Sequence, residues 1–138
     1  MKDVYSSLPF NESTFHAYGT LTNDHFIPWG FVLHDEAWDL APMFRNENSS
    51  KSDKLPKLEK YFDSFCAQHF NAIMTIKEAE LVSRHRKQFD SYRTIAPELD
   101  QYTRSDANRG SFYKRMKDTI YPLYQIALNQ GFSVWECV

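Results

Sequence analysis

The residues best suited to chemistry form an acidic cluster in the first third of the chain. His34, Asp35, Glu36 and Asp39 lie close together in the sequence. Hard metal ions and general acid–base catalysis both need clustered oxygen atoms of this kind. A β-turn also favours polar side chains, and Asp39 would then point outward from its strand. We therefore predict a surface turn here, with no catalytic and no metal-binding residue.

Cys66 and His69 form a second candidate group, because a thiolate and an imidazole one helical turn apart can both reach a zinc ion. A structural zinc needs four ligands, and no second pair of matching spacing is present. Cys66 also falls in an apolar stripe, where free cysteine behaves as a small hydrophobe. His85 lies in a similar stripe between Val82 and Phe89. We predict that all three residues belong to the core, and we expect no metal and no cofactor.

A third group is basic. Residues 84–117 carry nine Lys or Arg against four Asp or Glu. Binding to a phosphate backbone needs several cations on one surface. On a helical wheel, Arg86 and Arg93 lie on one flank of the apolar stripe, and Arg84 and Lys87 lie on the other. The basic candidates for binding are Arg84, Arg86, Lys87, Arg93, Arg109, Lys114, Arg115 and Lys117.

The common catalytic motifs are absent. The sequence contains no G-x-x-x-x-G-K-[ST], G-x-G-x-x-G, H-E-x-x-H or G-x-S-x-G. Phosphate-loop, dinucleotide, zincin and esterase chemistries therefore lack their characteristic residues. One histidine–carboxylate pair, Asp24 and His25, keeps an enzyme open as an alternative, although no spacing marks a nucleophile or a metal site.

The clearest strand pattern follows Pro28. Large apolar residues alternate in Trp29-Gly-Phe-Val-Leu33, and Ala37-Trp-Asp-Leu40 alternates again after a polar turn. Proline cannot donate to a β-ladder, so Pro28 and Pro42 bracket the pair. These patterns predict a β-hairpin over residues 29–41.

The remaining segments complete an α+β fold. Residues 45–54 contain no apolar side chain and predict a polar loop. Apolar residues at helical spacing follow at Leu58, Phe62 and Phe65, and later at Phe112 and Met116. Residues 132–137 alternate as a short C-terminal strand. We expect a small antiparallel sheet (hairpin about 29–41 plus C-terminal strand about 132–137) packed by three or four helices.

Length and composition favour one domain over residues 1–138. The chain has a formal net charge of −2 and only two cysteines, which do not make a disulfide scaffold. The sequence contains no apolar run of about 18 residues, which is the length that a membrane-spanning helix needs. The first residues lack the apolar run of a secretory signal. We therefore expect a cytoplasmic protein with no membrane partner.

One stretch resembles a known family. Thr22-Asn-Asp-His-Phe-Ile-Pro-Trp-Gly-Phe-Val-Leu33, followed by Trp38-Asp-Leu-Ala-Pro-Met-Phe44, resembles the catalytic-loop hairpin of HipA-type toxin kinases. In that family a D-x-x-x-x-N loop leads into an apolar strand, and a W-x-L-A-P strand ends at a metal-binding aspartate. The resemblance covers under a fifth of the chain.

This chain departs from that pattern where the kinase chemistry is done. With His25 at the family's histidine, Asn23 stands at the catalytic aspartate and Pro28 at the metal-binding asparagine. Arg45 stands at the metal-binding aspartate. Without these oxygens nothing would hold Mg²⁺ or orient an attacking hydroxyl. The resemblance therefore implies a kinase-like fragment used for binding and not for phosphoryl transfer.

Three functional hypotheses follow. Opposite charge at the two ends, net −5 over residues 1–50 (two basic, seven acidic) and +3 over residues 51–138 (fourteen basic, eleven acidic), favours a non-catalytic protein that docks on a protein partner as inhibitor, adaptor or immunity protein. Its acidic contacts would be Asp35, Glu36 and Asp39. The first alternative is a nucleic-acid-binding module using residues 84–117. The second is the histidine–carboxylate enzyme.

Overall fold

The computed structural model describes residues 1–137 and contains long helices with short strands. The helices are α1 (Glu12–Tyr18), α2 (Trp29–Val32), α3 (Arg45–Lys51), α4 (Leu58–Glu78), α5 (Arg86–Ile95) and α6 (Asp106–Asn129), with 3-10 turns η1 (Ala37–Asp39), η2 (Val82–His85) and η3 (Leu99–Gln101). The strands are β1 (Leu21–His25), β2 (Leu40–Phe44), β3 (Leu55–Pro56) and β4 (Val134–Trp135). The predicted α+β class is confirmed.

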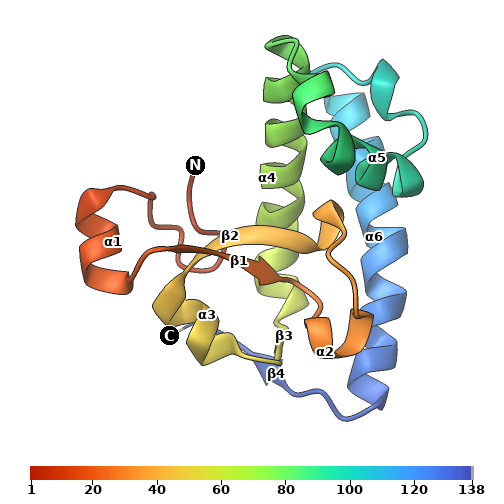
Figure 1. The fold of residues 1–138 in the computed structure, drawn as a ribbon. Coiled ribbons are helices and arrows are strands. Elements are labelled where there is room, and N and C mark those ends of the chain that lie inside the picture. Colours follow the sequence, from red (N-terminus) through yellow and green to blue (C-terminus); the bar gives the residue numbers. More distant parts are fainter. Residues whose placement is uncertain (138) are drawn as a thin grey trace.

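The helices α4 and α6 form the framework of the molecule and lie side by side (Figure 1). Apolar residues at three- and four-residue spacing give each helix one buried face, as their sequence predicts. On α4 these residues include Phe62, Phe65 and Phe70, and on α6 they include Phe112 and Met116, all of them buried. The hairpin β1–β2 crosses in front of α4. The helix α5 lies beside the upper part of α6 (Figure 1).

The antiparallel hairpin is present, but the predicted strands over 29–41 are wrong. β1 pairs with β2 in a register that joins Leu21 to Phe44 and His25 to Leu40. Residues 29–32 instead form α2 in the long connection between these strands. Pro28 precedes that helix with a φ of −53°, which suits a helix start. A short apolar run fits a helical turn as well as a strand. The alternation of large apolar residues after Pro28 therefore does not locate the hairpin.

The other two corrections concern the polar loop and the C-terminal strand. Residues 45–51 form the helix α3, although they carry no apolar side chain. β4 is short and pairs in parallel with β3, not with the hairpin, through bonds from the Leu55 N–H to the Ser133 carbonyl (2.8 Å) and from the Lys57 N–H to the Trp135 carbonyl (3.0 Å). The C-terminal segment therefore holds the connection between α3 and α4.

One aromatic contact anchors the connection after β1 to the helical framework. The Phe26 ring stacks on the Phe65 ring of α4 with centroids 4.3 Å apart, and both side chains are fully buried. Phe65 also packs against the His69 ring in a T-shaped arrangement, with centroids 4.4 Å apart.

No helix among the described residues has the length and apolar character that crossing a membrane requires.

We predict that Phe65→Ala lowers the free energy of unfolding by about 3–5 kcal/mol, because it leaves a cavity under Phe26. Urea denaturation checks this value. Ile126→Ala is the control, since Ile126 is 47% exposed and its loss should change stability by about 0.5 kcal/mol or less. Equal effects of the two substitutions would contradict the packing described here.

Candidate functional site

The candidate site lies where helix α3 packs along strand β1. Thr22 and Asp24 are two residues apart on β1, so their side chains share one face of the strand. Asn48 and Lys51 are three residues apart on α3 and share one face of the helix. Asn48 Nδ2 donates to Thr22 Oγ1 (3.1 Å), and Lys51 Nζ donates to Asp24 Oδ1 (3.1 Å). These polar contacts, not apolar packing, place α3 on β1.

The Asp24 carboxylate is held from two sides. Its side chain is 3% exposed, and besides Lys51 it accepts a hydrogen bond from the Tyr5 hydroxyl at Oδ2 (2.6 Å). Burial raises the pKa of Asp24, and the adjacent Lys51 ammonium and Tyr5 hydroxyl oppose that rise. Both carboxylate oxygens are thus hydrogen-bonded, one to Lys51 and one to Tyr5, although a carboxylate has about four lone-pair positions in all.

His25 follows Asp24 at the end of β1, and its side chain is 22% exposed. Nε2 lies 2.8 Å from Asp35 Oδ1 in the connection after β1. The His25 carbonyl accepts a hydrogen bond from Lys51 Nζ (2.7 Å). Within residues 1–137, no hydrogen bond engages Nδ1. His25 is therefore fixed through Nε2 and through its backbone carbonyl.

Asp39 is fully buried, so the prediction that it points outward as a docking contact is wrong. Its Oδ1 accepts the Ile27 N–H (2.8 Å), and its carbonyl accepts the Phe26 N–H (2.8 Å). These two bonds join the start of the β1–β2 connection, at Phe26 and Ile27, to its end at Asp39, next to His25. Burial raises the pKa of Asp39 well above its usual range, and its Oδ2 has no partner among the described residues.

The N-terminal segment, through Asp3 and Tyr5, contacts the elements that carry the site. Asp3 Oδ2 accepts the N–H of Phe44, the residue that precedes α3 (3.0 Å). The Tyr5 ring packs edge-on against Tyr61 (5.1 Å) and Trp135 (5.4 Å), while its hydroxyl reaches Asp24. Segments from both ends of the described chain therefore fix the position of the Asp24 carboxylate.

Asp24 and Asn48 could hold a divalent cation. Residues 1–137 contain no group of three or more His, Cys, Asp or Glu arranged around one ion. Mg²⁺ does not need such a group, because it keeps several waters and binds through one or two carboxylates together with substrate phosphates. The Asn48 amide nitrogen is directed to Thr22, and its oxygen makes no hydrogen bond within the described part of the chain. A carboxylate and an amide oxygen are ligand types that a hard cation prefers, and Asn48 is bonded to Thr22, two residues before Asp24 on β1. Lys51 Nζ lies 3.1 Å from Asp24 Oδ1, so a metal ion would share this carboxylate with an ammonium group.

The other sequence candidates lie outside this site. Cys66 and His69 are buried, as predicted. His69 Nδ1 is hydrogen-bonded to the Tyr92 hydroxyl, and burial lowers the pKa of His69 to about 4. His85 is only half-buried, in η2, so its predicted place in the core is wrong. Burial raises the pKa of the Cys66 thiol, which leaves it a poor nucleophile.

The basic candidates differ in the partners that their side chains contact. Three of them are in ion pairs: Arg93 with Asp90 and Asp100, Lys114 with Asp118, and Arg115 with Glu98. Two more on α6 lie over aromatic rings: Arg109 over Phe70 and Lys117 over Tyr121. Arg84, Arg86 and Lys87 lie at η2 and the start of α5 and have no ion pair within residues 1–137. Of these residues, Lys87 borders the hollow that also contains Asp35 and Glu36.

Asp24 and His25 are predicted from the sequence only as an alternative site, and Thr22, Asn48 and Lys51 are not predicted at all. The apolar-periodicity test cannot detect a helix whose inward face is polar. The available indication was the three-residue spacing of Asn48 and Lys51, which places them on one helix face.

Comparison with known proteins finds a family that resembles the N-terminal segment. Residues 3–57 match the family model of HNH endonucleases. The chain has no significant match among curated proteins or solved structures. The matched segment runs from Asp3 to the start of α4 and contains Asp24, His25 and Asn48. This match overturns the prediction of a non-catalytic docking protein. It does not bear on the resemblance to HipA-type kinases, which stays a prediction.

We predict that Asp39→Asn stabilises the protein increasingly as pH rises above about 4. Burial raises the pKa of Asp39 in the folded state, whereas in the unfolded chain it stays near about 3.9. Ionisation therefore costs folding free energy above the unfolded-state pKa, by about 1.4 kcal/mol per unit of difference. Asparagine never ionises. Urea unfolding at pH 4 and pH 8 measures the effect, and a pH-independent difference would contradict it.

Proposed function

We propose that this chain is a metal-dependent endonuclease that hydrolyses phosphodiester bonds in nucleic acid. One observation carries the proposal. An antiparallel hairpin followed by a helix brings Asp24 and His25 together with Asn48, inside the segment that matches HNH endonucleases. The three side chains supply the groups that hydrolysis of a phosphodiester needs, namely a base and oxygen ligands for a cation.

His25 serves as the general base. Its Nε2 is engaged by Asp35, so Nδ1 is the nitrogen that can take a proton from an attacking water. The water oxygen bonds to phosphorus as its proton passes to Nδ1. The bond from phosphorus to the leaving oxygen breaks, and that oxygen takes up a proton from solvent.

Asp24 and Asn48 are the residues that would hold a divalent cation. When bound, the cation neutralises charge on the phosphate and on the leaving oxygen. Lys51 is fully buried and does not reach the substrate. Its ammonium holds the Asp24 carboxylate and the His25 carbonyl at 3.1 and 2.7 Å, and thereby keeps both residues aligned at the end of β1.

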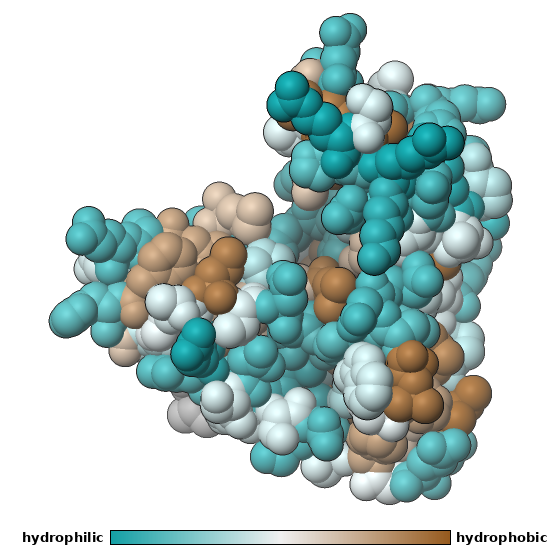
Figure 2. Space-filling model, viewed as in Figure 1, coloured by the Kyte–Doolittle hydropathy of each residue, from teal (hydrophilic) through white to brown (hydrophobic). Residues whose placement is uncertain are grey.

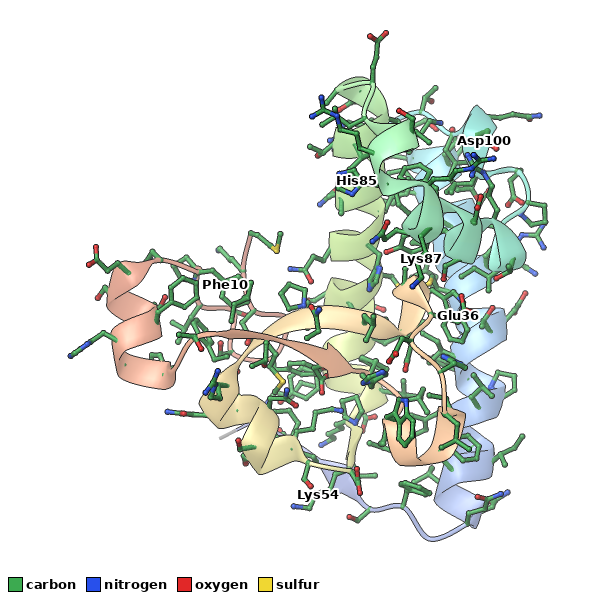
Figure 3. All side chains as sticks on the ribbon, in the orientation of Figure 1. Phe10, Glu36, Lys54, His85, Lys87 and Asp100 are labelled. Atoms are coloured by element: carbon green, nitrogen blue, oxygen red, sulfur yellow. The ribbon has the colours of Figure 1, made fainter. Side chains whose placement is uncertain are left out.

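The substrate is a polyanion, and one basic side chain, Lys87, borders the hollow beside Asp35. The lining of this hollow also includes the carboxylates of Asp35, Glu36 and Asp90, so Lys87 offsets part of their negative charge. Arg84 and Arg86 precede Lys87 in the chain and, like it, make no ion pair within residues 1–137. Figure 3 shows Lys87 extending from α5 toward the connection that carries Glu36. Phosphate contacts of this kind position a nucleic acid without reading its sequence. They would add to affinity in a salt-dependent way.

We predict that His25→Ala lowers the rate of nicking of supercoiled plasmid DNA by about 10²–10⁴-fold, the usual contribution of a general base. A circular substrate has no ends, so cutting it establishes endonuclease action. His16→Ala is the matched control, because His16 is exposed on α1, away from Asp24. Wild-type protein that cuts neither circular DNA nor single-stranded DNA or RNA would overturn the proposal.

We also predict that chelation with EDTA abolishes cleavage and that added Mg²⁺ restores it. Asn48→Ala removes one oxygen ligand and keeps the buried Lys51–Asp24 pair, so it should fold and need several-fold more Mg²⁺ for half-maximal rate. Calorimetric titration with Mn²⁺ gives a readout independent of cleavage. Asn129→Ala, on the exposed end of α6, is the control. Unchanged metal affinity in Asn48→Ala would exclude Asn48 as a ligand.

A further inference from the structure

The connection between β1 and β2 brings the Asp35 carboxylate within hydrogen-bond distance of His25, the proposed general base. Asp35 Oδ1 lies 2.8 Å from His25 Nε2, ten residues away in the sequence. An ionised carboxylate offers only acceptors, so the proton of the imidazole lies on Nε2. The lone pair of the neutral ring is then on Nδ1, the atom that the proposed hydrolysis requires. The contact therefore selects the tautomer that can act as a base.

The two residues that follow Asp35 are held by a helix outside the matched segment. Ser91 of α5 accepts the Ala37 N–H at Oγ (2.8 Å) and donates its hydroxyl proton to Glu36 Oε2 (2.5 Å). Residues on the C-terminal side of Asp35 are thus bonded to α5, while residues 3–57 alone match the endonuclease family. One hydroxyl connects the C-terminal helices to the loop that orients His25.

The same contacts border an open hollow. Its volume is about 470 Å³, and its lining includes Asp35, Glu36, Lys87 and Ser91. In the space-filling view, polar residues cover the region where α5 overhangs the hairpin (Figure 2). A ligand that reached His25 from this side would pass a wall formed by both halves of the chain.

We propose that Asp35 is a positioning residue for His25 and that Ser91 of α5 fixes the loop that carries it. This inference rests on the proposed nuclease function of His25. The C-terminal helices thereby complete a catalytic site whose reacting groups all lie in the N-terminal segment. In this role Asp35 acts on the reaction through the imidazole of His25.

A structural role alone does not account for this contact. The Asp35 side chain is 75% exposed, and an exposed ion pair contributes about 0–1 kcal/mol to stability. Variants at Asp35 should therefore fold normally. Their effect should be on the state of the His25 ring and on kcat, not on the unfolding temperature or on KM.

The first test is nitrogen-15 NMR of the histidine side chains at pH 8, with His25→Ala used to assign the signal. The wild-type His25 ring should be the Nε2–H form with a hydrogen-bonded N–H signal. Asp35→Ala should lose that signal and gain the Nδ1–H form. Asp118→Asn, which removes another exposed, ion-paired carboxylate, should leave the spectrum unchanged. A wild-type His25 ring with its proton on Nδ1 would overturn the inference.

The second test is plasmid nicking by the same variants. Asp35→Asn should lower kcat by at least about tenfold with KM nearly unchanged, and Asp35→Glu should restore much of the loss. Ser91→Ala should show a smaller decrease of the same kind. Equal rates for Asp35→Asn and Asp118→Asn would refute the positioning role even if the wild type cuts DNA. An inactive wild type with the expected ring spectrum would refute the nuclease function and not the hydrogen bond.

Discussion

The pair formed by Lys51 and Asp24 is the interaction on which the hairpin site depends. Both side chains are almost completely buried, and removing two charges from water is costly unless each finds good partners. Lys51 meets this requirement with Asp24 and the His25 carbonyl, and Asp24 meets it with Lys51 and Tyr5. These partners exist only when α3 lies against β1 in one register. The cost of burial thereby becomes a geometric constraint, which sets where His25 and Asn48 lie.

The sequence predicted the helical framework better than the hairpin. Phe62, Phe65 and Phe112 lie on buried faces of α4 and α6 because a long helix repeats its apolar spacing over several turns. The connection after β1 offered only a short apolar run, and such a run fits a helical turn or a strand. In the structure this run forms the helix α2, next to Phe26, which packs on Phe65.

The candidate site was harder to predict for a different physical reason. Asp24 and His25 are adjacent in the sequence and could be noticed as a histidine–carboxylate pair. Asn48 and Lys51 follow in a segment with no apolar residue, where the usual expectation is a solvated loop. Their partners, Thr22 and Asp24, are more than twenty residues earlier. Pairing of this kind depends on strand register, which composition and periodicity do not specify.

Contacts at the two ends of the described chain bear on the order in which the site is assembled during synthesis. The Tyr5 hydroxyl touches Asp24, but the Tyr5 ring is covered by Tyr61 and Trp135, and Trp135 Nε1 donates to Ser50 of α3 (3.2 Å). A growing chain on the ribosome carries the histidine long before it carries this tryptophan. Chains emerge N-terminus first, so Tyr5 and α3 gain the support of Trp135 only after that residue has left the exit tunnel. The arrangement around Asp24 and His25 would therefore be completed only after the helices α4, α5 and α6 have been synthesised.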